Sequence, residues 1–176
     1  GTNWQNEVFN SNAPVTNHDL TISGASDKIN YFLSLGYYRQ EGIVGGNYDR
    51  SNYNRLTLRS NTKYNIFDLS KERNWLNKMD VTVNLSYARV KSSSIDVNSQ
   101  YGSVLGSALA MSPILTPTLT TEGAAAQNEK YAGTTGYVPL YDKNGNMYTI
   151  AGADYNEMVN PLASLSLPGA QNWSHK

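Results

Sequence analysis

Apolar and polar residues alternate with a period of two in four successive segments, and this pattern constrains the fold more than any other feature. In the clearest segment the apolar set is Ile29, Tyr31, Leu33, Leu35 and Tyr37. Because successive side chains of a β-strand point to opposite faces, the alternation predicts strands with one apolar and one polar face. The other three segments cover residues 20–22, 55–59 and 80–87. No helix-length segment separates the four, so we expect neighbouring strands to be antiparallel.

The alternation therefore predicts an all-β fold, with four antiparallel amphipathic strands in residues 18–91. Residues 1–17 are expected to form a loop or a short helix before the strands. Residues 92–167 are too many for an ordinary connection, and we expect them to form a long excursion with some structure of its own. Residues 168–176 are expected to begin a further strand or a tail.

The excursion contains signals for a short helix and a hairpin. Residues 104–111 have helical spacing of apolar side chains and end before Pro113. Asn144-Gly145 lies within the extended-looking residues 138–150, and this pair favours a type I′ turn. The tetrapeptide Asn160-Pro161-Leu162-Ala163 is expected to start another extended piece.

Composition excludes several classes of protein. Lysine plus arginine number 14 and aspartate plus glutamate number 14, so the net charge is zero and a basic nucleic-acid-binding surface is not expected. The absence of cysteine excludes disulfide frameworks, thiolate zinc sites and a cysteine nucleophile. The sequence contains no run of about 18 apolar residues, so no transmembrane helix is predicted. The mean hydropathy of −0.51 still permits transmembrane strands, because about ten residues of alternating polarity average to little hydropathy.

The sequence offers no catalytic constellation. Its two histidines, His18 and His175, stand near opposite ends of the chain and are interpreted as surface residues. Residues 142–146 place oxygen ligands at alternate positions but lack the glycine and glutamate of a calcium loop, so we interpret them as a turn. We therefore expect a protein that is not an enzyme, with no catalytic residues, no metal site and no cofactor.

Aromatic residues gather at or near the ends of the predicted strands. On one interpretation they cap the core of a soluble β-sheet, where tyrosine is common. On the other they form the aromatic girdles at the two interfaces of a membrane barrel. Two polar sets fit either case, as the lining of a water-filled lumen or as a solvent-exposed face. They are Arg55, Thr57 and Arg59, and Asp80, Thr82 and Asn84. The aromatic residues concerned are Tyr31, Tyr37, Tyr38, Tyr53, Tyr64, Phe67, Trp75 and Tyr87.

Several stretches, taken as a set, resemble one family of transporters. They are TNWQNEVF, HDLTISGASDK, YFLSLGYYRQEGI, YDRSNYNRLTLRSN, VNLSYARVKS, SALAMSPILTP and NPLA, in this order over nearly the whole chain. The set resembles the early barrel segment of SusC/RagA-type TonB-dependent outer-membrane transporters. Members of that family are several times longer, with a plug domain and a barrel of about 22 strands. The resemblance implies that this chain is part of such a transmembrane β-barrel, followed by a long extracellular loop that carries a short helix and a hairpin.

The resemblance also implies a function and partners. It implies a protein of the outer membrane of a Gram-negative bacterium that imports oligosaccharides or peptides as nutrients. TonB would supply the energy through regions absent from this chain, and a SusD-like surface lipoprotein would assist in capturing the ligand. Outer-membrane lipid is a further expected partner, and nucleic acid is not. The alternative is a self-contained, soluble, β-rich module of the cell surface that binds carbohydrate.

The resemblance places the connections on two sides of the membrane and assigns roles to two sets of residues. It implies periplasmic turns at residues 26–27 and 71–74, and extracellular loops at residues 41–48 and 92–167. The lipid-facing set is Ile29, Leu33, Leu35, Val81, Val83 and Leu85. The candidates for contact with ligand or lipoprotein are Tyr101, Tyr131, Tyr137, Tyr141 and Tyr148. For most of these tyrosines the alternative role is to pack the loop against itself.

Overall fold

The chain forms two compact units, each built from segments that are separated in the sequence. The computed structural model describes residues 1–67, 69, 71–95, 102–151, 158–167 and 171–175. The sheet unit comprises Pro14–Gln40, Tyr53–Ser92 and Gln171–Lys176. The loop unit comprises Gly1–Ala13, Glu41–Asn52 and Ser93–Ala170.

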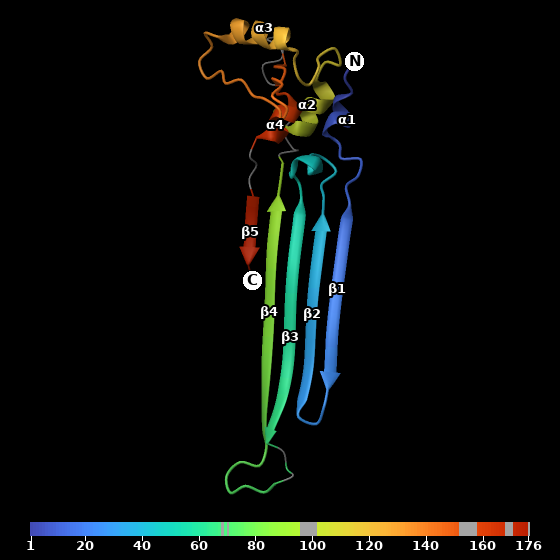
Figure 1. The fold of residues 1–176 in the computed structure, drawn as a ribbon, viewed down its shortest axis with the longest axis vertical. Coiled ribbons are helices and arrows are strands. Elements are labelled where there is room, and N and C mark those ends of the chain that lie inside the picture. The colour runs from blue at the N-terminus through green and yellow to red at the C-terminus, as the bar shows by residue number, and fades with distance from the viewer. Residues whose placement is uncertain (68, 70, 96–101, 152–157, 168–170, 176) are drawn as a thin grey trace. The chain divides into compact units, whose positions relative to one another are not determined.

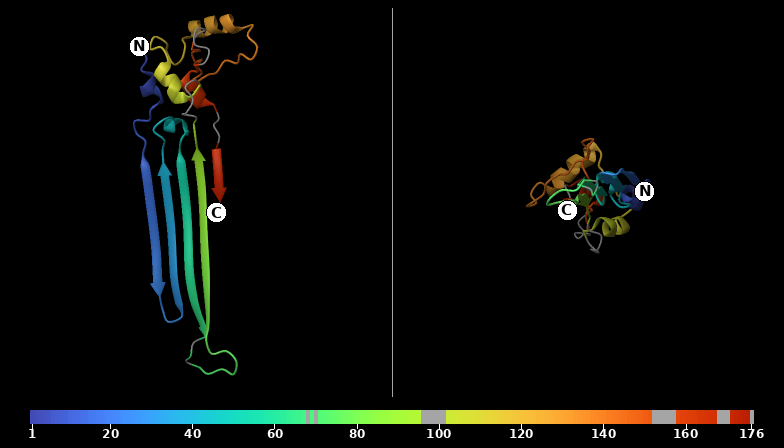
Figure 2. Two further views of the ribbon diagram at one scale, coloured as in Figure 1. Left: turned by 180° about the vertical axis from the view of Figure 1, so that it is seen from behind. Right: turned by 90° about the horizontal axis from the view of Figure 1, so that it is seen from below.

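The sheet unit is a single five-stranded sheet in which the order of the strands in space is their order along the chain (Figure 1). Its strands are β1 (Val15–Ala25), β2 (Ile29–Gln40), β3 (Tyr53–Phe67), β4 (Met79–Ser93) and β5 (Gln171–His175). The pairs β1–β2, β2–β3 and β3–β4 are antiparallel. Figure 2 shows the four long strands side by side from behind. The predicted antiparallel all-β architecture is therefore confirmed.

The register of the strands follows the hydrophobic pattern. Leu35 of β2 lies opposite Leu20 on one side and Leu58 on the other, and Leu58 lies opposite Tyr87 of β4. Because a slip of one residue would move every apolar side chain to the other face, such matched rows fix the register strongly. The pairing of β3 with β4 is regular except for a register shift between Asn65 and Phe67.

The loop unit contains four short α-helices and a turn of 3₁₀-helix among its described residues. They are α1 (Trp4–Val8), η1 (Gly46–Tyr48), α2 (Val104–Ala110), α3 (Thr121–Tyr131) and α4 (Pro161–Ser166). The helix expected at residues 104–111 is confirmed as α2, and α1 is a short helix within residues 1–17, where a loop or a short helix was expected. Across the described part of the chain, no helix is both long enough and apolar enough to cross a bilayer.

Two local expectations in the loop unit are wrong. The extended piece expected at Asn160 is helix α4, because the Asn160 side chain accepts hydrogen bonds from the amides of Leu162 and Ala163, and Pro161 occupies the first helical turn. The turn at Asn144-Gly145 is not of type I′. Gly145 has a φ of 84° and its amide bonds to the Asp142 carbonyl at 3.1 Å, while Asn144 has a negative φ, which is a type I turn followed by a left-handed glycine.

The core of the loop unit joins segments that are far apart in the sequence. Trp4 and Val8 of α1 pack with residues of α2 and α4, and the Trp4 indole donates a hydrogen bond to the Ser112 carbonyl at 2.9 Å. The buried cluster consists of Trp4, Val8, Val104, Ala108, Met111, Tyr148, Ala151, Leu162, Ala163 and Leu165. This core holds the segments after β4 in a defined structure.

Candidate functional site

The sheet unit carries one mainly apolar face, and all six residues predicted to face lipid lie on it. In the strand register Leu33 and Leu85 are both opposite Ser60, and Ile29 and Val81 are both opposite Tyr64. Each row of this face contains one residue of β3 and its partners on β2 and β4. The β3 residues are Leu56, Leu58, Ser60, Thr62 and Tyr64, listed from the end of the sheet where β2 and β4 end toward the end where they begin. The structure therefore brings Ile29, Leu33, Leu35, Val81, Val83 and Leu85 onto a single surface.

This apolar face is exposed in the described structure. Leu33 retains 40% of its surface and Leu85 retains 54%, although both lie in the middle of the sheet. Leu20 and Ile22 of β1 extend the same surface and are also exposed. Soluble monomers rarely expose contiguous apolar patches beyond a few hundred Å², so a face of this kind indicates contact with lipid or another apolar surface.

Tyrosines border the apolar face at both ends. Tyr37 and Tyr87 lie toward the end that leads into the loop unit, and Tyr31 and Tyr64 lie toward the opposite end. The row that contains Tyr37 and the row that contains Tyr64 are eight residues apart on β3, which is about 27 Å along the strand. A strand tilt of about 40° reduces this to roughly 21 Å, close to the height of the apolar band of membrane barrels, about 25 Å.

The opposite face of the sheet is polar and includes the predicted set Arg55, Thr57 and Arg59. A depression of about 350 Å³ on this face is lined by these residues together with Asp19 and Tyr38. The Arg55 guanidinium carbon lies 5.9 Å from the centre of the Tyr38 ring, a cation–π distance. The sheet therefore has an apolar face on one side and a polar, hydrogen-bonding face on the other.

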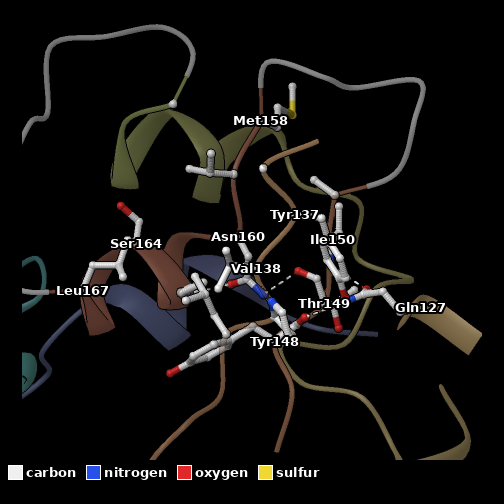
Figure 3. A pocket seen from close by; sticks show the side chains of 17 residues that line it. Gln127, Tyr137, Val138, Tyr148, Thr149, Ile150, Met158, Asn160, Ser164 and Leu167 are labelled. Atoms are coloured by element: carbon white, nitrogen blue, oxygen red, sulfur yellow. Dashed lines mark hydrogen bonds between the residues drawn. The ribbon is translucent and has the colours of Figure 1, made fainter. Parts of the chain in front are cut away.

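The loop unit contains a pocket of about 400 Å³ (Figure 3). Its wall is mostly apolar and includes Val138, Ile150 and Met158. Two amides organise the polar part of the wall. Gln127 donates to the Tyr148 carbonyl at 3.0 Å and accepts from the Ile150 amide at 3.0 Å. Asn160 donates to the carbonyls of Thr149, at 3.0 Å, and of Pro117, at 2.8 Å. These bonds fix the backbone around the pocket.

One hydroxyl in the pocket wall is buried without a hydrogen-bond partner. Thr149 is only 5% exposed, and its Oγ1 has no hydrogen-bond partner among the described residues. A buried hydroxyl without a partner carries a free-energy cost of about 1–3 kcal/mol. The pocket thus combines an apolar wall with a small number of fixed polar groups, the usual composition of a small-molecule site.

The structure gathers some of the predicted contact tyrosines and separates others. Tyr137 and Tyr148 line the pocket, and the Tyr131 ring packs against Tyr137 with 5.5 Å between ring centres. The Tyr137 hydroxyl donates to Asn128 at 2.8 Å. Tyr141 is exposed and pairs with Met147 in the hairpin. Tyr101 lies outside the described residues.

Two groups in the loop unit have perturbed pKa values. Burial raises the pKa of the Tyr48 phenol, and the nearby Tyr148 and Glu7 raise it further. Hydrogen bonds, led by the Asn146 amide, hold the pKa of the Asp142 carboxyl below its ordinary value. The carboxylate accepts from the amides of Asn144 and Asn146, both at 2.8 Å. Within the described residues no group of three or more histidine or acidic side chains is placed to hold a metal ion.

Sequence reasoning missed the polar residues that shape the pocket, namely Gln127, Thr149 and Asn160. Asn160 had a usable signal, because asparagine before proline is a common start of a helix. Gln127 had a weaker one, since it lies in α3, whose N-terminus is capped by Thr120. Thr149 had none, because its burial depends on contacts with distant segments.

The comparisons with known proteins point to one family. SusC, a TonB-dependent receptor of Bacteroides thetaiotaomicron, is 28% identical over 172 residues, which cover 94% of this chain and 14% of SusC. TonB-dependent receptors P3 and P26 of Formosa agariphila are 35% and 39% identical over 65 and 59 residues, and each match covers 6% of the relative. The matched part of the chain thus spans about a seventh of the length of SusC and a smaller share of the two Formosa receptors. No family model and no solved structure matches it.

Proposed function

We propose that this chain, a segment similar to SusC-type TonB-dependent receptors, forms part of the wall of an outer-membrane importer in a Gram-negative bacterium. The observation that carries the proposal is the exposed apolar face backed by a polar face on one antiparallel sheet. A membrane-spanning strand needs about 9–11 residues, and β1 to β4 contain 11, 12, 15 and 15. The apolar face would contact lipid through Ile29, Leu33, Leu35, Val81, Val83 and Leu85, and the polar face would line the lumen.

The proposed activity is transport of an oligosaccharide or a peptide for nutrient uptake, without bond chemistry. In such a protein the ligand passes through the barrel after a conformational change of the receptor. TonB would drive this change through parts of the receptor outside this chain. The similarity to receptors rather than to enzymes supports this choice. A SusD-like surface lipoprotein would cover the loop side and assist in capturing the ligand.

The loop unit supplies the proposed contacts with ligand or lipoprotein. Tyr137 and Tyr148 line the pocket, together with Thr149. A tyrosine ring combines an apolar body with a polar tip, which suits both sugar rings and peptide side chains. Tyr101, Tyr131 and Tyr141 remain candidates for contact from their proposed extracellular loop.

The test is the behaviour of the native gene product in the bacterium that encodes it. An antibody against this segment should detect a band several times larger than 19.4 kDa in the outer-membrane fraction. That band should migrate differently when unheated, because membrane barrels resist unfolding by detergent. Deletion of the gene should abolish growth on at least one glycan or peptide source. A soluble band near 19.4 kDa would instead support the carbohydrate-binding module and overturn the proposal.

A further inference from the structure

The turn of the hairpin in the loop unit contains the single Asn-Gly pair of the sequence, Asn144-Gly145. Asparagine is a chemically labile residue. The backbone nitrogen of the following residue can attack its side-chain amide, and glycine hinders this attack least because it has no side chain. Asn144 and Gly145 are both exposed, and a Cβ atom placed on Gly145 would meet no heavy atom within 4 Å. The reacting groups and solvent therefore have room at this pair.

Hydrogen bonds to Asp142 hold the attacking nitrogen in place. The Gly145 amide donates to the Asp142 carbonyl at 3.1 Å. The Asp142 carboxylate accepts from the amides of Asn144 and Asn146, both at 2.8 Å, and from the Asn146 side chain at 3.1 Å. The Asn144 side chain has no hydrogen-bond partner within the described part of the chain. The amide that would be attacked is therefore free to turn, whereas the nitrogen that would attack it is bound.

We propose that Asn144 is a site of spontaneous deamidation and that the hydrogen bonds of Asp142 set its rate. When these bonds open, the Gly145 nitrogen loses its proton to a base in the solvent and attacks Cγ of Asn144. The new bond joins this nitrogen to Cγ, the bond from Cγ to Nδ2 breaks, and the side-chain nitrogen takes up a proton and leaves as ammonia. Water then opens the resulting succinimide ring at either carbonyl, which gives aspartate or isoaspartate. The reaction consumes water, releases ammonia and changes no oxidation state.

Isoaspartate at position 144 would loosen the hairpin and one wall of the pocket. Its main chain runs through Cβ and Cγ and is longer by a methylene group, and its carboxylate adds a negative charge beside Asp142. The hairpin keeps its register through the bond from the Asp142 amide to the Asn146 carbonyl, at 2.8 Å, and the bond from the Tyr148 amide to the Leu140 carbonyl, at 2.9 Å. Tyr148 and Leu140 also line the pocket. Deamidation would therefore limit the working life of the pocket, and the chemistry is the same whether or not the chain lies in a membrane.

The experiment follows Asn144 in the purified native gene product, at its full length, during incubation in mildly alkaline buffer. Mass spectrometry of the peptide that contains Asn144 measures the exchange of NH₂ for OH, and fragmentation by electron transfer separates isoaspartate from aspartate. The same protein unfolded in guanidinium chloride gives the rate of the unrestrained pair. Asn10 is the internal reference, because its side chain donates to Glu41 at 3.3 Å and accepts from the Asn12 amide at 3.2 Å.

Two variants change the restraint and two serve as controls. Asp142→Ala removes the carboxylate, and Asp142→Asn keeps an acceptor oxygen without the charge. Glu122→Ala is the matched control, since it removes an exposed carboxylate of α3 in the same unit. Asn144→Gln should remove the signal, because its longer side chain would have to form a larger ring. Amide hydrogen exchange in α2 and α4 checks that each variant keeps the core of the loop unit, and Asp142→Asn decides the outcome if Asp142→Ala loses it.

Asn144 should deamidate in the unfolded protein, and on the order of tenfold to a hundredfold more slowly in the folded parent, because hydrogen bonds to a charged group must open first. Asp142→Ala should react on the order of tenfold faster than the folded parent. Asp142→Asn should lie between the two, and Glu122→Ala should match the parent. Equal rates in the folded parent and in Asp142→Ala would overturn control by Asp142. Faster deamidation at Asn10 than at Asn144, or none at Asn144 in any sample, would overturn the site itself.

Discussion

Replacement of Leu85 by arginine tests the lipid-facing role of the apolar face. Leu85 shares its row with Ile22, Leu33 and Ser60, and this row is the central one of the five between Tyr37 and Tyr64. If the face contacts lipid, Leu85 lies near the middle of the bilayer. Arginine there is expected to cost about 2–4 kcal/mol of folding free energy in a membrane. That cost corresponds to a change of roughly 30-fold to 900-fold in the folding equilibrium.

The neighbouring position provides a matched control. Asn84 precedes Leu85 on β4 and lies on the polar face, opposite Asn61. Asn84→Arg adds the same side chain at almost the same depth, but toward the proposed lumen, and should change stability by no more than about 0.5 kcal/mol. The two variants therefore differ only in the face that receives the charge.

The assay is reversible unfolding of the full-length receptor in lipid vesicles with guanidinium chloride, followed by tryptophan fluorescence. A lower midpoint for Leu85→Arg alone supports lipid contact at the apolar face. A soluble protein would give a different result, because Leu85 is 54% exposed and its replacement would then cost little. Equal midpoints for the two variants would refute the assignment of this face to lipid.

Three further predictions concern the loop unit. Asn160→Ala removes the cap of α4 and the hydrogen bonds to the Thr149 and Pro117 carbonyls, of which the first is buried and the second partly buried. It should destabilise the loop unit by about 2–3 kcal/mol, seen as faster amide hydrogen exchange at Ser164 with unchanged exchange in β2. Leu165→Ala empties a position that is 1% exposed and should cost about 2–5 kcal/mol in thermal or denaturant unfolding of this unit, whereas unchanged unfolding would show that the site collapses without loss. Because the folded-state pKa of Asp142 is lowered, its contribution to the turn should be complete above its ordinary pKa and disappear as the pH falls through the lowered value. The Asn146 amide shift in an NMR titration reports this change, and Asp142→Asn should remove the pH dependence.

The strands were predictable because their pattern is local and repeated. Residues 81–87 alternate strictly, and residues 29–37 alternate with Phe32 as the exception, so polarity identifies the face of nearly every side chain. The antiparallel pairing was predicted because no helix-length segment separates the strands, whereas the register of the strands was not predicted and comes from the structure. The six lipid-facing candidates could therefore be placed on one surface from the sequence, although their contact with lipid stays a prediction.

The loop unit was less predictable because its structure depends on distant contacts and on caps. Helix α3 lacks a continuous apolar stripe and has no fully buried residue, so hydrophobic spacing gave no signal for it. Helix α4 has only six residues, and its burial comes from packing against α1 and α2. The type I′ prediction failed because the Asp142 side chain caps the turn and holds Asn144 at negative φ.

The discontinuous make-up of the loop unit has a consequence for the order of folding. Each pair of long strands joins neighbours in sequence, so hairpins can form early at a small cost in loop-closure entropy. The bond from Trp4 to Ser112 instead joins residues 108 positions apart, and it can form only after all four long strands have left the ribosome. Formation of the Trp4 contact thus requires that the whole intervening chain has been synthesised. During refolding, protection of Trp4 fluorescence from an added quencher should appear later than strand formation.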